Sequence, residues 1–198
     1  MGKKYKILGI SGSPREGSTN YMLRTVLDAT ASDYELIALK DKRIAPCHAC
    51  GGCFKSHKCV IKDDMQELYN KMSEANIIVL ASPTYFSNVT GLMKNFIDRC
   101  LPLYLSEALR EKRVALISVG NFKKNEVMFS DGFDIDKAIK DPSQRKVLIS
   151  SVKKCLTTLK SFSVNHMGMQ LIGNVAAINS DVKIKSVKLA KLGKKIIS

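Results

Sequence analysis

The chain has 198 residues, of which 45% are hydrophobic and 25% are charged, with a formal net charge of +14. It contains no run of the roughly 18 apolar residues that a membrane-spanning helix needs, and its N-terminal apolar run is too short for a secretory leader. We therefore expect one globular domain over residues 1–198, cytoplasmic and without a membrane partner, whose cysteines stay reduced.

Five short apolar runs have the composition of buried strands. They span residues 5–10, 34–39, 76–83, 113–120 and 170–177. The segments that follow each run carry apolar residues at helical spacing, which predicts a helix after every strand. These helices are expected at 20–29, 63–75, 91–100, from Asp141 onward and over 182–196. Asp63 is placed to cap the second of them, with Gln66 three residues on.

Strands that alternate with helices pair in parallel and are joined by right-handed crossovers. Five strands favour the flavodoxin-like order 2-1-3-4-5 over the six-stranded dinucleotide-binding order. We therefore predict an α/β fold with a doubly wound, five-stranded parallel sheet and a compact cysteine loop after strand two. In such sheets a ligand binds beyond the carboxyl ends of the strands, so the loops at that edge are the candidate binding segments.

The loop after the first expected strand, "SGSPREGSTN" at 11–20, is rich in hydroxyl groups and leads directly into a helix. Its backbone N–H groups and the helix dipole suit a phosphate. Serine stands where a P-loop needs lysine, which excludes a nucleoside triphosphate, and the dinucleotide pattern G-x-G-x-x-G is missing. A single terminal phosphate, as in FMN, fits better, although a loop that only caps the helix is the alternative. The candidate binding residues are Ser11, Ser13, Arg15, Ser18, Thr19 and Asn20.

The loop after the third strand, "SPTYFSNVTG" at 82–91, places two aromatic residues at a strand end. Its backbone and polar groups can meet the edge of a flavin ring, while its aromatic residues can equally pack on a neighbouring helix or subunit. Together with the first loop it predicts a two-part flavin site at one edge of the sheet. The candidate residues are Pro83, Thr84, Tyr85, Phe86 and Ser87.

Four of the six cysteines lie in "CHACGGCFKSHKC" at 47–59, with the spacing C-x2-C-x2-C-x5-C. Three cysteines in steps of three resemble the run that wraps a [4Fe–4S] cluster in bacterial ferredoxins, and a Gly-Gly pair lets the backbone fold close. Structural zinc, aided by His48 or His57, is an alternative. A disulfide, which a reducing compartment disfavours, and no site at all also remain open. Cys100 and Cys155 fall on expected helices and are interpreted as small core residues.

Three segments, "SGSPREGSTN", "SPTYFSNVTG" and the intervening "CVIKDDM", resemble the flavodoxin-like NAD(P)H-dependent FMN reductases, and the likeness covers nearly the whole chain. Within that family, the cysteine block resembles the iron–sulfur flavoproteins of anaerobic archaea and bacteria. The resemblance implies that the first segment binds the FMN phosphate and the second binds the ring. It also implies a [4Fe–4S] cluster, and its ligands would be Cys47, Cys50, Cys53 and Cys59. One segment departs from the family pattern, because "SVGNFKKNE" stands where a glycine-rich sequence is usual.

The expected function is that of a redox protein in which FMN and a [4Fe–4S] cluster pass electrons between a donor and an acceptor. The donor would be an acidic ferredoxin-like protein, which the positive charge suits, or NAD(P)H. No side chain is expected to act as a catalytic acid or base. The family likeness further implies a homodimer or homotetramer, with the cluster close to an FMN of a neighbouring subunit.

Two other functions follow from the same residues. One is an NAD(P)H-dependent FMN or quinone reductase without a cluster. The other is a basic flavin-binding module that recognises nucleic acid. The chain carries no RNA-binding aromatic signature and no helix-turn-helix pattern, so a nucleic-acid partner is not expected.

Overall fold

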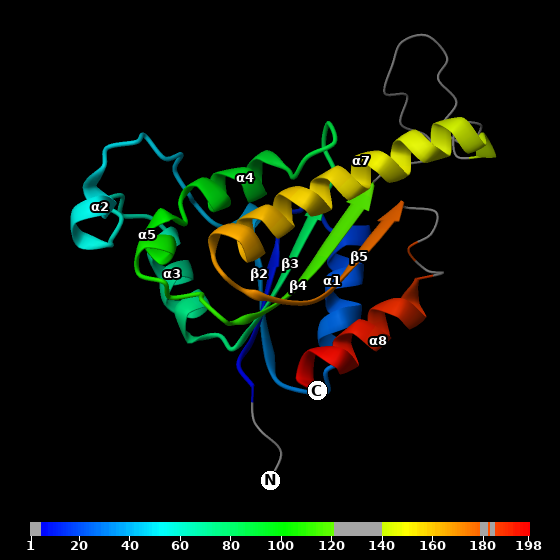
Figure 1. The fold of residues 1–198 in the computed structure, drawn as a ribbon, viewed down its shortest axis with the longest axis horizontal. Coiled ribbons are helices and arrows are strands. Elements are labelled where there is room, and N and C mark those ends of the chain that lie inside the picture. The colour runs from blue at the N-terminus through cyan, green and yellow to red at the C-terminus, as the bar shows by residue number, and fades with distance from the viewer. Residues whose placement is uncertain (1–4, 121–139, 179–181, 183–184) are drawn as a thin grey trace.

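The computed structural model describes residues 5–120, 140–178, 182 and 185–198. Its five strands form one parallel sheet in the order β2-β1-β3-β4-β5, which confirms the predicted fold class (Figure 1). They are β1 (Ile7–Ser11), β2 (Tyr34–Ala38), β3 (Ile77–Pro83), β4 (Arg113–Gly120) and β5 (Gln170–Ile178). The predicted strands differ from these only at their ends. A strand ends where its backbone pairing with a neighbouring strand ends, and composition does not show that point.

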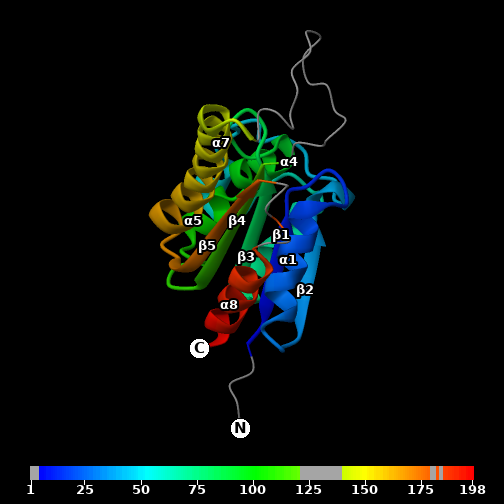
Figure 2. The ribbon, with the colours of Figure 1, turned by 90° about the vertical axis from the view of Figure 1, so that its right-hand side faces the viewer.

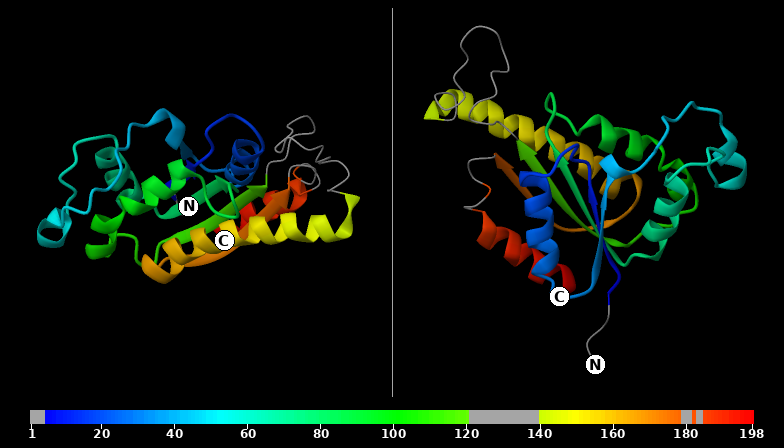
Figure 3. Two further views of the ribbon diagram at one scale, coloured as in Figure 1. Left: turned by 90° about the horizontal axis from the view of Figure 1, so that it is seen from above. Right: turned by 180° about the vertical axis from the view of Figure 1, so that it is seen from behind.

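Helices cover both faces of the sheet (Figure 2). One face carries α1 (Ser18–Asp28) and α8 (Ser186–Ile197), which lie in front of the strands in the right-hand view of Figure 3. The opposite face carries α3 (Met65–Glu74), α4 (Gly91–Asp98) and α7 (Pro142–Lys160). Four shorter segments complete the described helices: a 3-10 turn at Leu39–Asp41, α2 (Gly52–Ser56), α5 (Leu101–Leu105) and a π-helical turn at Ser161–His166. The sequence patterns did not predict the first three, because each is too short to show a period. The π-helical turn directly continues α7, the helix expected from Asp141 onward.

The strands read as continuous apolar runs because the sheet is buried on both faces. In β3, Ile77 and Val79 enter the core under α1 and α8, whereas Ile78 and Leu80 enter the core under α3, α4 and α7. Successive side chains of a strand point to opposite faces, so a single strand supplies both cores. Cys100 and Cys155 are both 0% exposed in the second of these cores, which confirms that they are core residues.

The parallel register brings the carboxyl ends of the strands to one edge. Ser11 at the end of β1 pairs with Ala38 of β2 and with Ala81 of β3. Pro83 at the end of β3 pairs with Val119 of β4. The loops that leave these strands therefore start close together. Among the described residues no helix combines the length and the apolar character that crossing a bilayer requires.

Candidate functional site

The loops after β1 and β3 are joined directly. Gly12 N donates to Ala81 O at 2.8 Å, and the Thr90 hydroxyl donates to Gly12 O at 2.7 Å. Thr90 also caps α4, because its hydroxyl accepts from Met93 N at 3.2 Å. A side chain at Gly12 would place its Cβ 2.7 Å from Met93 Cβ, so only glycine permits this close approach. Thr90 was not among the residues predicted from the sequence, although threonine before an apolar helical run is a recognisable capping signal.

Some of the predicted donors in the first loop hold the loop itself. The Ser11 hydroxyl donates to Asn20 Oδ1 at 2.5 Å, and Asn20 Nδ2 donates to a Glu16 carboxylate oxygen at 2.9 Å. The Ser13 hydroxyl donates to Arg15 O at 2.7 Å. Ser11 and Asn20 are buried, at 0% and 3% exposure, so the bond between them is shielded from water. The polar side chains predicted for ligand binding thus also shape the loop.

The start of α1 is suited to an anion. Its N-cap residue is Gly17, and no side chain caps the helix in this fully described segment. Its first turn, also described throughout, contains no acidic residue. The first N–H groups of a helix have no intrahelical partners and carry the positive end of the dipole, so an uncapped start favours a phosphate group. Ser18 opens this helix and Thr19, which is buried, follows it.

The third-strand loop ends in a tight turn that exposes an aromatic ring. Tyr85 and Asn88 exchange two backbone hydrogen bonds, both of 2.9 Å, across Phe86 and Ser87. These two central residues have φ of 47° and 63°, as a type I′ turn requires. Phe86 is 99% exposed, so its ring is not packed on the described parts of the chain. A bulky residue held in the left-handed region is unusual and marks a constrained position.

Hydrogen bonds fix this turn against its surroundings. The Thr84 N–H donates to Val119 O at 2.7 Å, and its hydroxyl lies 3.2 Å from that of Ser118 on β4. The hydroxyls of Ser87 and Ser151 are 2.8 Å apart, which joins the turn to α7. The loop is therefore attached to both the sheet and a helix, and its exposed ring projects from a rigid base.

The four loop cysteines are free thiols, and none forms a disulfide. Cys47 and Cys50 are exposed, whereas Cys53 and Cys59 are half-buried. Burial raises the pKa of Cys53, and the neighbouring Cys59, Cys50 and Cys47 raise it further, while a backbone hydrogen bond lowers it. The pKa of the Cys53 thiol thus responds to the other three loop thiols. Within the described residues, however, no three His, Cys, Asp or Glu side chains are already gathered to hold a metal ion.

The cysteine loop contains one short helix and projects from the side of the sheet (Figure 1). Gly51 precedes α2 with φ of 72°, a left-handed conformation that suits glycine. The Cys50 sulfur would lie 3.7 Å from a Cβ on Gly52, so the thiol passes close over the backbone there. Helix α2 packs against α5. The two glycines at the centre of the loop, Gly51 and Gly52, have no side chains, so the backbone there can approach a cluster closely.

The cysteine loop has two stems, the residues just before Cys47 and those just after Cys59. Asp63 and Arg99 join these two stems. Asp63 accepts from Ala45 N at 2.9 Å and from Met65 N, the first residue of α3, at 3.1 Å. The N-cap position itself is Asp64, whose side chain makes no capping bond, so Asp63 supports the helix start from one residue earlier. The expected reciprocal bond from Gln66 is not made. Gln66 Nε2 donates instead to Ile61 O at 2.7 Å and to Cys59 O at 3.3 Å. The carboxylate faces a buried guanidinium, and the helix-start signal in the sequence did not reveal that partner.

The charge state of Asp63 reflects this environment. Burial raises the pKa of Asp63, but hydrogen bonds from Arg99 and from the backbone of Ala45 and Met65 outweigh it. The pKa of this carboxyl is therefore below its usual range. Arg99 carried no signal in the sequence, because a single arginine at a helix end is most often a surface residue.

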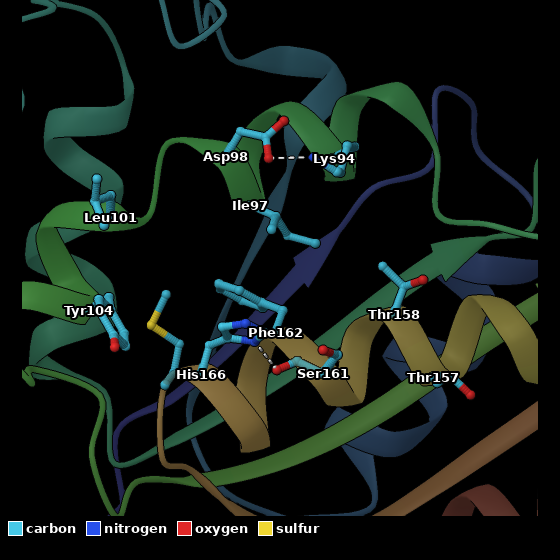
Figure 4. Close-up of a pocket in the computed structure, with 11 residues that line it drawn as sticks. Lys94, Ile97, Asp98, Leu101, Tyr104, Thr157, Thr158, Ser161, Phe162 and His166 are labelled. Atoms are coloured by element: carbon cyan, nitrogen blue, oxygen red, sulfur yellow. Dashed lines mark hydrogen bonds and ion pairs between the residues drawn. The ribbon is translucent and has the colours of Figure 1, made fainter. Parts of the chain in front are cut away.

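A separate hollow of about 590 Å³ lies between α4, α5 and the end of α7 (Figure 4). Its apolar lining includes Ile97 and Phe162, and the Lys94–Asp98 ion pair lies at its rim. His166 Nδ1 lies 2.7 Å from Ser161 O and faces the same space. The predicted flavin and cysteine residues do not line this hollow. The candidate site is therefore the strand-end edge and the cysteine loop beside it.

The chain resembles known proteins at two levels. Residues 5–127 match the family described as NADPH-dependent FMN reductase. An iron-sulfur flavoprotein of Methanocaldococcus jannaschii is 43% identical over 119 residues, which cover 58% of this chain and 62% of that protein. An iron-sulfur flavoprotein of Methanosarcina thermophila is 38% identical over 120 residues, covering 58% of this chain and 63% of that protein. The matched part thus spans about three fifths of the length of these relatives.

Solved structures agree with the fold. An azoreductase of Bacillus anthracis superposes with a TM-score of 0.64, covering 96% of this chain and 99% of that protein. Its sequence is 13% identical, so the likeness concerns the arrangement of strands and helices alone. The segment after β4, where the sequence departs from the family pattern, lies outside the described residues from position 121.

Proposed function

Since this chain belongs to the NADPH-dependent FMN reductase family, we propose that it is an FMN-dependent oxidoreductase that also carries a [4Fe–4S] cluster. It passes electrons between a ferredoxin-like or reduced nicotinamide donor and an acceptor. One observation carries this proposal: an uncapped helix start and a four-cysteine loop both follow strands of the same parallel sheet. When bound, FMN exchanges electron pairs with a nicotinamide, and the cluster passes electrons one at a time.

The first loop is the proposed phosphate site. The N–H groups at the start of α1 point to the anion, and Arg15 supplies a positive charge beside them. Ser18 and Thr19 add hydroxyl groups at the helix start, whereas the Ser13 hydroxyl already donates to Arg15 O. Ser11 and Asn20 act mainly by holding the loop, because each is already bonded to the other. This division predicts that binding depends on the shape of the loop as much as on any single hydroxyl.

The third-strand loop is the proposed ring site. Tyr85 and Phe86 offer exposed aromatic surface, at 44% and 99% exposure. Thr84 and Ser87 hold the turn, and Pro83 ends the strand before it. A flat ring gains both apolar contact and stacking from such a surface, at little cost in entropy because the turn is already fixed.

The cysteine loop is the proposed cluster site, with Cys47, Cys50, Cys53 and Cys59 as ligands. Four free thiols between Cys47 and Cys59 are the donor set that a [4Fe–4S] cluster uses. Gathering the sulfurs is coupled to binding, as it is at many metal sites. The reducing cytoplasm keeps such thiols available. Because α2 packs against α5 at the side of the fold, a neighbouring subunit in a homodimer or homotetramer can bring its FMN to this loop.

The surface around the cysteine loop suits an acidic electron donor. Lys55, Lys58 and Lys62 are exposed on or beside the loop. Phe54 and Val60 are also exposed, at 63% and 53%, which adds apolar surface between the charges. Lysine side chains attract an acidic partner toward the loop, and the exposed apolar groups offer surface that the partner can bury on binding.

The test is the composition of anaerobically purified protein. We expect bound FMN and about four iron and four acid-labile sulfide atoms per chain. Replacing Cys47 by Ser should remove most of the iron and leave FMN in place, whereas Cys155→Ala should keep both. FMN without iron or sulfide in the wild type would establish the alternative, a cluster-free NAD(P)H-dependent FMN or quinone reductase. The absence of FMN would overturn both.

A further inference from the structure

Arg99 is a charged side chain in a place where charge is rarely found. It follows α4, and its side chain is 0% exposed. Its guanidinium binds Asp63 through two bonds, from Nη1 to Oδ2 at 2.6 Å and from Nη2 to Oδ1 at 3.1 Å. Bringing such a pair out of water costs several kcal/mol per ion, so good geometry is needed to offset the cost.

The same guanidinium reaches both stems of the cysteine loop. Nη1 also donates to Ala45 O at 2.6 Å, on the stem before the cysteines. Nη2 also donates, at 3.4 Å, to the sulfur of Cys59, the last of the four cysteines and the start of the stem that follows them. The backbone of Arg99 is held from a third side, because the Tyr69 hydroxyl donates to Arg99 O at 2.6 Å. The guanidinium is thus fixed in relation to one cysteine sulfur.

This arrangement is not explained by stability alone. Arg99 Nε is buried without a hydrogen-bond partner in the described structure, which adds a further desolvation cost. A buried ion pair can often be replaced by apolar residues without loss of stability. A guanidinium is always charged, and here it donates to a sulfur atom. It therefore stabilises negative charge on that sulfur, which an apolar residue would not do.

We propose that Arg99 is a positioning residue that raises the reduction potential of the cluster through the Cys59 sulfur, and that Asp63 holds its guanidinium in place. This inference rests on the proposed function. Reduction adds an electron, and therefore negative charge, to the cluster and its sulfur ligands. A hydrogen bond and a positive charge at one sulfur stabilise that reduced state. Cys59 differs in this respect from Cys47 and Cys50, which are exposed to solvent.

The proposal predicts shifts of opposite sign at the two partners. Arg99→Gln removes the positive charge and should lower the potential. Asp63→Asn keeps an oxygen that can accept from the guanidinium but removes the negative charge that offsets it, so it should raise the potential. Arg99→Lys keeps the charge, but its three donors on one nitrogen cannot make the four bonds that the planar fork makes to Asp63, Ala45 and Cys59. It should lower the potential by less than Arg99→Gln does.

The experiment is an anaerobic redox titration of the full chain with FMN bound, followed by electron paramagnetic resonance of the reduced cluster. We expect Arg99→Gln and Asp63→Asn each to change the equilibrium constant for one-electron reduction by about tenfold, or about 59 mV, in opposite directions. Lys6→Gln and Glu74→Gln are matched controls, because they make the same charge changes in an ion pair whose side chains are 69% and 65% exposed. Screening by solvent should leave their potentials unchanged.

The outcomes separate this inference from the proposed function. A wild type without iron and sulfide would overturn the proposed function, and the inference would fall with it. A cluster whose potential is unmoved by all three variants, or moves the same way in Arg99→Gln and Asp63→Asn, would overturn the inference alone. If Arg99→Gln fails to assemble a cluster, Arg99→Lys and Asp63→Asn decide by sign. Loss of the cluster in all three, with the controls intact, would reduce Arg99 to a support of the loop and also overturn the inference.

Discussion

The paired loops after β1 and β3 differ from the cysteine loop in how they are held. The first two are joined to each other through Gly12 and Thr90 and are fixed to β4 and α7. The cysteine loop is held at its two stems. Asn95 and Arg99 donate to the carbonyls of Ile44 and Ala45 before the cysteines, and Gln66 donates to Ile61 O after them. Between the stems its side chains are mostly exposed.

The difference shows two ways of building a cofactor site. The register of parallel strands brings the proposed flavin loops together before any ligand arrives, because the strands that carry them are neighbours. The thiols of the cysteine loop are close in sequence, but in the described part of the chain they are not gathered to hold a metal ion. Metal binding can supply the free energy that orders such a segment, so only its ends need to be fixed in advance.

The largest effect is expected at the stems of the cysteine loop. Asp63→Asn should destabilise the cluster-free protein by about 3 kcal/mol at pH 7, because Arg99 would lose its buried counter-charge. The pKa of Asp63 is lowered in the folded state, so its contribution is complete above the unfolded value of about 3.9 and is lost as pH falls through the lower folded value. Urea unfolding between pH 7 and pH 3 measures this. A difference between wild type and variant that does not shrink in acid would contradict the assignment, and Glu74→Gln serves as the exposed control.

A smaller effect is expected where the flavin loops touch. Gly12→Ala should cost about 1–3 kcal/mol and weaken FMN binding, because the new methyl group would meet Met93 Cβ, which is fixed to α4. Gly91→Ala is the matched control, since a Cβ there meets nothing within 4 Å and Gly91 is not one of the proposed binding residues. Thermal unfolding and FMN titration of both variants provide the comparison. Equal effects at the two glycines would show that the contact between the loops is not what shapes the site.

The link made by Thr90 should be worth less. Thr90→Val removes the hydroxyl that caps α4 and bonds to Gly12 O, at a cost of about 1 kcal/mol. Thr25→Val is the control, because the Thr25 hydroxyl only returns to Tyr21 O within an exposed turn of α1. Chemical denaturation of both variants tests this. If Thr25→Val lost as much stability as Thr90→Val, the effect would come from the loss of any threonine hydroxyl and not from the link between the two loops.

The smallest change in stability, and one of opposite sign, is expected at the exposed turn. Phe86→Gly should stabilise the protein by about 0.5 kcal/mol, because relief of the left-handed strain exceeds the added entropy of glycine. The same change should weaken FMN binding by about 1 kcal/mol if the flavin ring stacks on the Phe86 side chain. Calorimetric titration with FMN measures both the affinity and the binding enthalpy. Unchanged affinity would remove Phe86 from the ring site, and Tyr104→Ala is an exposed aromatic control.

Much of the fold followed from local pattern. Runs such as that around Ile77 are apolar on both faces, and this is the mark of a parallel sheet covered by helices. The short helices α2 and α5 escaped notice, because five residues cannot show a helical period. Gln66 was expected to complete a helix cap. Its side-chain amide instead donates to Cys59 O and Ile61 O, because the fold places these two backbone carbonyls near it.

The sequence by itself determined the order of strands and helices, the hydroxyl-rich loop and the spacing of the four cysteines, because all of these depend on neighbours along the chain. Only the tertiary structure decided that Thr90 joins two loops and that Arg99 reaches across to Asp63 and Cys59. Those contacts join residues 36 to 78 positions apart, and no local pattern encodes them. The physical reason is burial: a buried guanidinium must find its partners wherever the packed chain offers them, whereas an exposed one is satisfied by water.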